Sequence, residues 1–188
     1  EYIKKIITKK KKWIKKKIKE QECYSKKILR AFENGDILFY FGKKYKLFSI
    51  LSDNEYIQLK DDNFYVFYKR KNNNLKKIIE NWYKIQITNY ININLYKLAK
   101  RMEIKFKSVK IVSFKRRLGS CSINGELSFN WKLIMVPKEI INYIIVHELC
   151  HLKHFNHSKE FWSLVSNYVP EFKRHNYWIK KNFNNTFW

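Results

Sequence analysis

Cysteine is scarce in this chain of 188 residues, and no long apolar run occurs in it. Cys23, Cys121 and Cys150 are unevenly spread and show no disulfide framework, which favours a reducing compartment such as the cytoplasm. No apolar run approaches the roughly 20 residues of a transmembrane helix, and no signal-peptide pattern is apparent. We therefore expect a cytoplasmic protein without a transmembrane segment.

Acidic side chains and arginine are scarce as well. The chain carries 40 basic and 16 acidic residues, a formal net charge of +24, yet only six of the basic residues are arginine. Sequence-specific readers of nucleic acid tend to use arginine for bidentate contacts, so the composition does not favour that class. The abundant Lys, Asn, Ile, Tyr and Phe residues share A/T-rich codons, which makes genome composition an alternative source of the charge.

A dense basic stretch lies near the start of the chain, at residues 9–12 and 15–17. Its apolar partners recur at helical spacing, which predicts a helix over about residues 2–32 with a break near Glu22. The favoured interpretation is a solvated lysine face on a helix that packs against the domain. The alternatives are nonspecific contact with nucleic-acid phosphates and attachment to an anionic membrane. The apolar partners are Ile3, Ile7, Ile14 and Ile18.

Four short strand-like segments follow, separated by turns rich in Gly, Asn and Asp, and their spacing predicts an antiparallel meander. Residues 71–74, a Lys-Asn-Asn-Asn run, mark the expected boundary between two parts of the chain. We expect an N-terminal lobe of helix and meander over residues 1–71 and a core over residues 75–188. The predicted strands are Ile37–Phe41, Tyr45–Leu51, Tyr56–Lys60 and Phe64–Lys69.

The second part is predicted to combine helices with strands around one hairpin. A long helix runs from Leu75 to about Met102, and Asn124-Gly125 is a strong signal for the hairpin turn. Two short helices, split at Pro170, come last. The strands are expected at Val109–Phe114, Ser120–Ile123 and Glu126–Asn130. The long helix is expected to bury Ile78, Ile79, Trp82, Tyr83, Ile85, Leu95, Leu98 and Ala99.

Four of the five histidines fall within eleven residues, in the run His147-Glu148-Leu149-Cys150-His151-Leu152-Lys153-His154-Phe155-Asn156-His157. The run contains the pattern H-E-x-x-H. Residues four apart share a helix face, so His147 and His151 can hold one zinc ion, with Glu148 in reach of a metal-bound water. The apolar residues from Ile140 to Val146 indicate a buried helix, in which such groups would be costly if unpaired. We therefore predict a zinc site here.

A site with one open position needs a third protein ligand. His157 is favoured, because the residues before it can end the helix and let the chain fold back, with Ser158 as N-cap of the next helix. His154 and Glu160 are the alternatives: the first lies farther along the same helix face, and the second follows in the next helix. Cys150 points away from the ligand face and is expected to be a packed thiol.

The expected chemistry is peptide-bond hydrolysis. Zinc lowers the pKa of its bound water toward neutrality, Glu148 takes the proton, and the hydroxide attacks a carbonyl that the metal polarises. Glu148 then passes the proton to the leaving amine. Pro137 suits the first turn of the helix that carries these groups. The same machinery would hydrolyse another amide, so the sequence predicts a reaction type and leaves the substrate open.

Further motifs flank the cluster over about the last eighty residues. In order and spacing they resemble the YgjP-like zinc metallopeptidases, small zincins related more distantly to SprT-like and WLM-type proteases. One departure is Leu118, where that family usually has tryptophan, and it concerns packing rather than the metal. The motifs are Arg117-Leu118-Gly119-Ser120-Cys121-Ser122, Asn124-Gly125, Leu127-Ser128-Phe129-Asn130-Trp131-Lys132-Leu133, Pro137, Tyr143, Asn156-His157-Ser158 and Phe161-Trp162.

The resemblance implies one zinc ion per chain, ligated by His147, His151 and His157, with Glu148 as the catalytic residue. It also implies a peptide or protein substrate. The expected fold is α+β, with a zincin-like core in which the long helix backs a small sheet and the metal helix lies beside it.

Substrate is commonly received in extended form at an edge strand of such folds, and Glu126–Asn130 is the candidate. An oxyanion stabiliser is also expected beside the metal. Tyr168, Arg174, His175 and Tyr177 lie in the right region of the sequence, which does not discriminate among them. His175, a single histidine in a basic helix, is more typical of a surface residue.

Three functions follow from these patterns. The favoured one is a cytoplasmic zinc-dependent peptidase that uses Glu148. The second is a protease recruited to DNA or RNA through the basic N-terminal stretch, where it would cut bound proteins. The third is a non-enzymatic binding module in which a fourth ligand, such as His154, closes a structural zinc site.

Overall fold

The computed structural model describes residues 10, 11, 13, 15, 32–70 and 74–186. Most of the predicted N-terminal helix, with its expected break near Glu22, lies outside the described residues, and so do residues 71–73 of the expected boundary. The division at that boundary and the proposed contact with nucleic acid therefore stay predictions. Phe32, the expected end of the helix, is not helical. No helix within these ranges has both the length and the apolar character that crossing a membrane requires.

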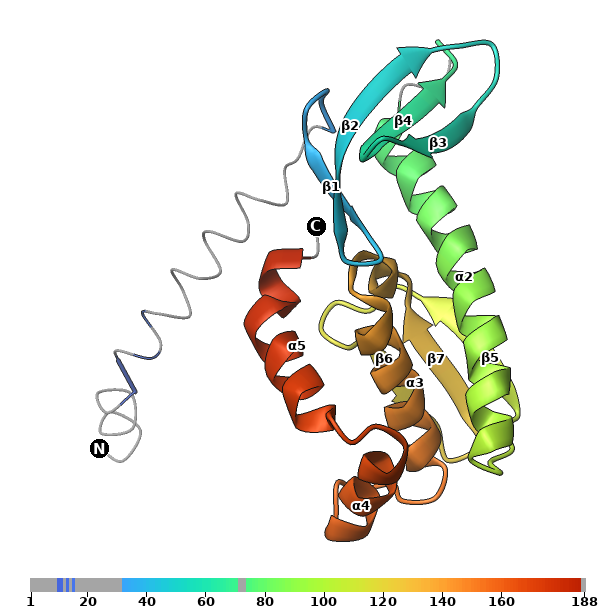
Figure 1. The fold of residues 1–188 in the computed structure, drawn as a ribbon, viewed down its shortest axis with the longest axis vertical. Helices are drawn as coiled ribbons and strands as arrows, with labels where there is room; N and C mark the ends of the chain where they lie inside the picture. Colours follow the sequence, from blue (N-terminus) through green and yellow to red (C-terminus); the bar gives the residue numbers. More distant parts are fainter. Residues whose placement is uncertain (1–9, 12, 14, 16–31, 71–73, 187–188) are drawn as a thin grey trace. The chain divides into compact units, whose positions relative to one another are not determined.

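The first sheet contains four strands in the order β1-β2-β4-β3 (Figure 1). The pairs β1–β2 and β3–β4 are antiparallel, but β2 and β4 run parallel, so the predicted antiparallel meander is wrong. Phe64 and Val66 of β4 are fully buried, whereas β3 is exposed at every second residue. The more apolar strand thus takes a central position. The strands are β1 (Ile37–Tyr40), β2 (Lys43–Leu51), β3 (Tyr56–Lys60) and β4 (Asn63–Tyr68).

Helix α2 (Leu75–Arg101) begins and ends close to the predicted residues. Asn74 caps it, because its side-chain oxygen accepts a hydrogen bond of 3.0 Å from the backbone N–H of Lys77. The buried face consists of every fourth residue, so it is narrower than predicted. Ile85, expected in that face, is 58% exposed, and Ile87, which was missed, is fully buried. The buried residues are Ile79, Tyr83, Ile87, Ile91, Leu95 and Ala99.

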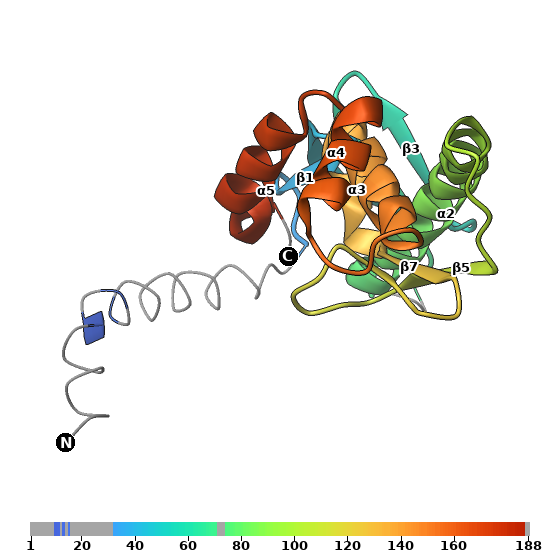
Figure 2. The same cartoon turned by 90° about the horizontal axis from the view of Figure 1, so that it is seen from below.

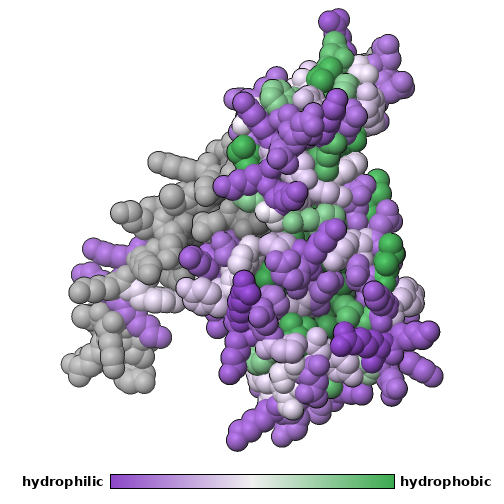
Figure 3. All heavy atoms as spheres, viewed as in Figure 1, coloured by the Kyte–Doolittle hydropathy of each residue, from purple (hydrophilic) through white to green (hydrophobic). Residues whose placement is uncertain are grey.

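The outer side of α2 carries several exposed apolar side chains, Ile85, Ile93 and Tyr96 among them. Figure 3 shows hydrophobic groups along the edge where α2 runs, separated by hydrophilic side chains that cover most of the visible face. Exposed apolar side chains in small groups are normal on soluble proteins. We therefore attach no binding function to them.

The second sheet has the order β5-β7-β6, with β5 (Ser108–Val112) parallel and β6 (Gly119–Cys121) antiparallel to β7 (Glu126–Asn130). The hairpin predicted at Asn124-Gly125 is confirmed. The prediction that Glu126–Asn130 forms an edge strand is wrong, because β7 pairs with β5 on one side and with β6 on the other. Its residues Leu127 and Phe129 are fully buried, as suits a central strand. Strand β6 is instead an edge of this sheet.

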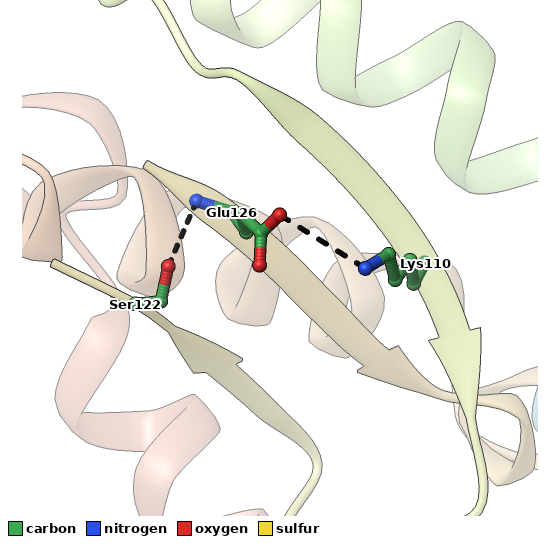
Figure 4. A network of polar contacts seen from close by, with 3 residues as sticks. All are labelled: Lys110, Ser122 and Glu126. Atoms are coloured by element: carbon green, nitrogen blue, oxygen red, sulfur yellow. Dashed lines mark hydrogen bonds and ion pairs between the residues drawn. The ribbon is translucent and has the colours of Figure 1, made fainter. Parts of the chain in front are cut away.

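Glu126 on β7 contacts a residue on each side, Ser122 just after β6 and Lys110 on β5 (Figure 4). Its backbone N–H donates a hydrogen bond of 3.1 Å to the hydroxyl oxygen of Ser122, just after β6. Its carboxylate lies 3.9 Å from the ammonium group of Lys110 on β5. Both contacts are consistent with the register of β7 between its two neighbours.

Helix α3 (Lys138–His151) is the predicted metal helix, and it is buried on nearly all sides. It lies between α5 (Phe172–Thr186) and α2 in both views (Figures 1 and 2). The 3-10 helix η1 (Trp131–Met135) leads into it, and α4 (Lys159–Tyr168) follows it. A helix that is apolar all round belongs in a core, so the burial expected from the sequence is confirmed.

The start of α3 is held by the turn between β1 and β2. Phe41 and Gly42 both have positive φ, 47° and 82°, as in the two-residue hairpin turns that favour glycine. A Cβ atom on Gly42 would lie 2.8 Å from Cγ of Pro137, the N-cap of α3. The Phe41 N–H also donates a hydrogen bond of 2.7 Å to the carbonyl of Ile134 in η1. The first sheet therefore fixes where the metal helix begins.

The buried face of α2 can be tested with two substitutions on one helix. We expect Ile87→Ala to lower the free energy of unfolding by about 2–5 kcal/mol, because it leaves a cavity in the core. Ile85→Ala should change it by no more than roughly 0.5 kcal/mol, since that side chain is mainly exposed. Denaturant unfolding of both variants measures the difference, and equal losses would contradict the observed orientation of the helix.

Candidate active site

Three histidines converge at the end of α3. His147 and His151 come from its last turns, and His157 comes from the segment before α4. The Nε2 atom of His147 lies 3.2 Å from that of His151 and 3.1 Å from that of His157. Tetrahedral zinc with bonds of about 2.0–2.1 Å to nitrogen places its ligand atoms roughly 3.3 Å apart. The Nε2 atom of His147 therefore lies from each of the other two at the spacing that one such ion requires, and all three ligand atoms lie within 4.8 Å of one another.

The tautomer of His151 is set by a backbone contact. Its Nδ1 atom lies 3.0 Å from the carbonyl oxygen of His154, which can only accept, so Nδ1 carries the proton. The lone pair is then on Nε2, the atom that faces the other two imidazoles. Orientation of this kind by a second partner is usual for histidines that bind metals.

The two alternatives to His157 lie elsewhere. His154 and Glu160 line a separate depression along α4. Within the described residues, the one group of three or more potential metal ligands consists of His147, His151 and His157. Cys150 is fully buried, in agreement with the prediction of a packed thiol.

Burial favours the neutral form of His147 and His151. It lowers the pKa of His147 to about 3, helped by the neighbouring His151 and His157, and it also lowers the pKa of His151. The Nδ1 atom of His147 is buried and finds no hydrogen-bond partner among the described residues. Neutral imidazole is the form that binds a metal, and imidazole nitrogens suit zinc as they do copper, iron and nickel. The donor set therefore fits the metal that the sequence predicts.

Glu148 lies beside the cluster and is 6% exposed. Burial raises the pKa of its carboxyl to about 8, although the positive charge of Arg117 acts in the opposite direction. The backbone of β6 packs directly against it: a Cβ atom on Gly119 would lie 2.6 Å from Oε1 of Glu148. Sequence reasoning missed this role of Gly119, although its place in a chain with four glycines was a usable signal.

An open cleft of about 420 Å³ gives access to these groups. One wall is formed by residues 116–119, which lead into β6, and the other by α3 and α5. His147 and Glu148 both line it, so one candidate metal ligand and the carboxyl face the same space. Leu118, the departure from the family pattern, is 8% exposed and also lies in the wall.

Aromatic rings surround the imidazoles. The ring of Phe161 at the start of α4 lies 5.0 Å from that of His147 and 4.5 Å from that of His151, centroid to centroid. Trp162 stacks on His157 at 5.5 Å. Ser158 caps α4 as predicted, its hydroxyl oxygen accepting from the N–H of Phe161 at 3.3 Å. The cap therefore helps to hold the ring that packs on the ligands.

Of the four residues considered as oxyanion stabilisers, three make no contact with the histidine cluster in the described part of the chain and one, His175, packs on a neighbour of it. The guanidinium of Arg101 makes a cation–π contact with the ring of Tyr168. Arg174 forms an ion pair of 3.0 Å with Glu171, and the side chain of Tyr177 is 67% exposed. None of these contacts is with the histidine cluster.

His175 is partly exposed, and its ring lies 5.7 Å from that of Tyr143. Tyr143 in turn packs on His147 at 6.0 Å. Tyr143 therefore lies in contact with both His175 and the candidate metal ligand His147. Burial raises the pKa of Tyr143 to about 12, so its hydroxyl stays protonated at neutral pH.

The contact between Gly119 and Glu148 predicts a specific coupling. Gly119→Ala should destabilise the protein by about 1–3 kcal/mol, because the added methyl group overpacks the carboxyl. In a Glu148→Ala background the same change should be neutral or slightly stabilising. A double-mutant cycle from denaturant unfolding measures this difference. Equal effects in both backgrounds would show that the close approach is not present.

Comparison with known proteins places the chain in a family. A family model described as a YgjP-like metallopeptidase domain matches residues 1–182. Among solved structures the chain is similar to the metallopeptidase zymogen abylysin of Pyrococcus abyssi, with 24% identity and a TM-score of 0.44 over 48% of this chain and 93% of that one.

The zymogen jannalysin of Methanocaldococcus jannaschii gives 24% identity and a TM-score of 0.45 over 50% and 96% of the two chains. The comparison with curated proteins gives no match. The family match spans nearly the whole sequence, so this protein belongs to the YgjP-like metallopeptidases and is a hydrolase that depends on a metal ion.

Proposed function

We propose that this protein hydrolyses peptide bonds with one zinc ion held by His147, His151 and His157, and with Glu148 as the acid–base residue. Three imidazole nitrogens that all lie within 4.8 Å of one another, beside a buried carboxyl, carry the proposal. Three protein ligands leave one position of a tetrahedron open, which is the arrangement of catalytic rather than structural zinc.

A bound zinc ion supplies Lewis acidity, which activates water and polarises the scissile carbonyl. Glu148 accepts a proton from the attacking water and delivers it to the leaving nitrogen. An acid–base residue works best with a pKa near the operating pH. Burial raises the pKa of Glu148 to about 8, and the positive charge of a bound zinc ion would lower it again, which leaves a carboxylate that can accept the proton. The close approach of Gly119 restricts where the carboxyl can move. The restricted position of the Glu148 carboxyl suits a group that takes a proton from water and gives it to the leaving nitrogen.

Strand β6 supports the positioning of a substrate. It pairs with β7 on one side, and Gly119 at its start lines the cleft beside Glu148. An extended peptide that adds to an edge strand receives backbone hydrogen bonds without regard to its sequence. We expect such a peptide to place a backbone carbonyl next to the histidine cluster.

The ligand set can be tested with two neighbouring histidines. The purified chain should contain about one zinc ion per molecule. His157→Ala should weaken zinc binding by more than the roughly 10–100-fold that loss of an outer-shell partner costs. His154→Ala is the matched control and should keep the metal, because His154 contributes only its backbone carbonyl. Zinc content by mass spectrometry and competition with a chelator measure both, and similar retention in the two variants would remove His157 from the site.

The role of Glu148 can be tested with an isosteric neutral side chain. Glu148→Gln should keep zinc and lower kcat/KM on a cleavable peptide by about 10²–10⁴-fold, the usual contribution of a general acid–base group. Glu160→Gln should leave turnover unchanged, since that carboxyl is exposed and lies outside the cluster. Turnover by zinc-loaded Glu148→Gln at the parent rate would overturn the mechanism.

A further inference from the structure

The cleft beside the histidine cluster is rimmed by positive charge. Arg116 and Arg117 line it from the segment that leads into β6, and Lys180 lines it from α5. All three are exposed, and no ion pair found among the described residues involves any of them. Glu148 is the one acidic residue in the lining. We call Arg116, Arg117 and Lys180 the cationic rim.

The arginine-bearing segment is anchored by Asn130, which is 2% exposed at the end of β7. Its side-chain amide donates hydrogen bonds of 2.9 Å to the carbonyl of Phe114 and 2.8 Å to the carbonyl of Arg117. Its side-chain oxygen accepts from the N–H of Lys132 at 3.2 Å, and its own N–H donates to the carbonyl of Leu118 at 2.8 Å. A segment held in this way is set in place before a ligand arrives, which lowers the entropic cost of binding.

The side chain of Arg117 is oriented as well. Its guanidinium carbon lies 5.3 Å from the centre of the Phe114 ring, a cation–π contact. Its charge also acts on the buried carboxyl of Glu148. Arg117 therefore belongs to the anchored segment, and its charge acts on the group that we propose for catalysis. A planar guanidinium presents a rigid fork of donors that matches a carboxylate.

We propose that the cationic rim binds a carboxylate of the peptide substrate, next to the bond that is cut, so that the enzyme selects acidic segments. This inference rests on the proposed function, because it identifies the substrate class of the same cleft. The net charge of +24 would further favour the approach of acidic chains. The carboxylate could belong to an Asp or Glu side chain or to the C-terminus of the substrate, and the test separates these two sources.

Binding to a full-length, zinc-loaded Glu148→Gln protein tests the rim without requiring turnover. One pair of fluorescent peptides differs only in Glu against Gln at an internal position, with the C-terminus amidated. A second pair differs only in a free against an amidated C-terminus. We expect the carboxylate form of at least one pair to bind roughly tenfold tighter, as one charge-assisted contact predicts. The pair that responds identifies the source of the carboxylate.

Adding Arg117→Gln should bring the two members of that pair to nearly equal affinity. Arg101→Gln is the matched control, because it removes an arginine of α2 that does not line the cleft. On the other wall, Lys180→Gln should reduce the preference and its neighbour Lys181→Gln should not. In the active enzyme, Arg117→Gln should raise KM for the acidic peptide more than for its neutral partner.

The outcomes separate the two proposals. Discrimination for carboxylate in a protein whose parent cuts no peptide would keep the rim and overturn the proposed hydrolysis. Hydrolysis without discrimination, or equal losses in Arg117→Gln and Arg101→Gln, would overturn the rim. Failure to bind either member of both pairs would also overturn it.

Discussion

The site depends on the burial of α3. A helix surrounded by apolar neighbours carries His147, Glu148 and His151, and the same desolvation acts on all of them. It lowers the pKa of His147 to about 3 and raises that of Glu148 to about 8, so both groups favour their uncharged forms. Groups like these destabilise a core unless they gain partners. A metal ion supplies such a partner to the imidazoles, and its binding free energy offsets part of the cost.

The surrounding elements hold this helix at both ends. The turn at Gly42 packs on Pro137 at its start, and His151 is oriented near its end by the carbonyl of His154. Between them, the backbone of β6 at Gly119 limits the position of the Glu148 carboxyl. None of these contacts takes part in the proposed reaction. Each removes a freedom that would otherwise misplace a reacting group, and small misplacements cost large factors in rate.

Local patterns were readable from the sequence, and long-range ones were not. The H-E-x-x-H spacing, the cap at Ser158 and the extent of α2 follow from helical period and capping, which involve neighbours along the chain. The order of strands depends on partners far apart in sequence, so the expected meander and the expected edge strand at Glu126–Asn130 were both wrong. Ile85 was misplaced for a related reason, since the width of the buried face depends on what packs against it. The contact of Gly119 with Glu148 likewise joins two elements.

Charge shows most clearly why position matters more than composition. A lysine-rich chain can owe its net charge to codon usage, and a total of +24 does not say where on the surface an acidic ligand would bind. Arginine is different here, because only six occur and two of them, Arg116 and Arg117, are adjacent at the mouth of the cleft. Lysine would supply the same charge but not the planar fork that fixes the direction of a carboxylate. Asn130 anchors the segment that carries both arginines. A composition biased toward lysine does not account for such anchoring, which is consistent with the binding of a carboxylate.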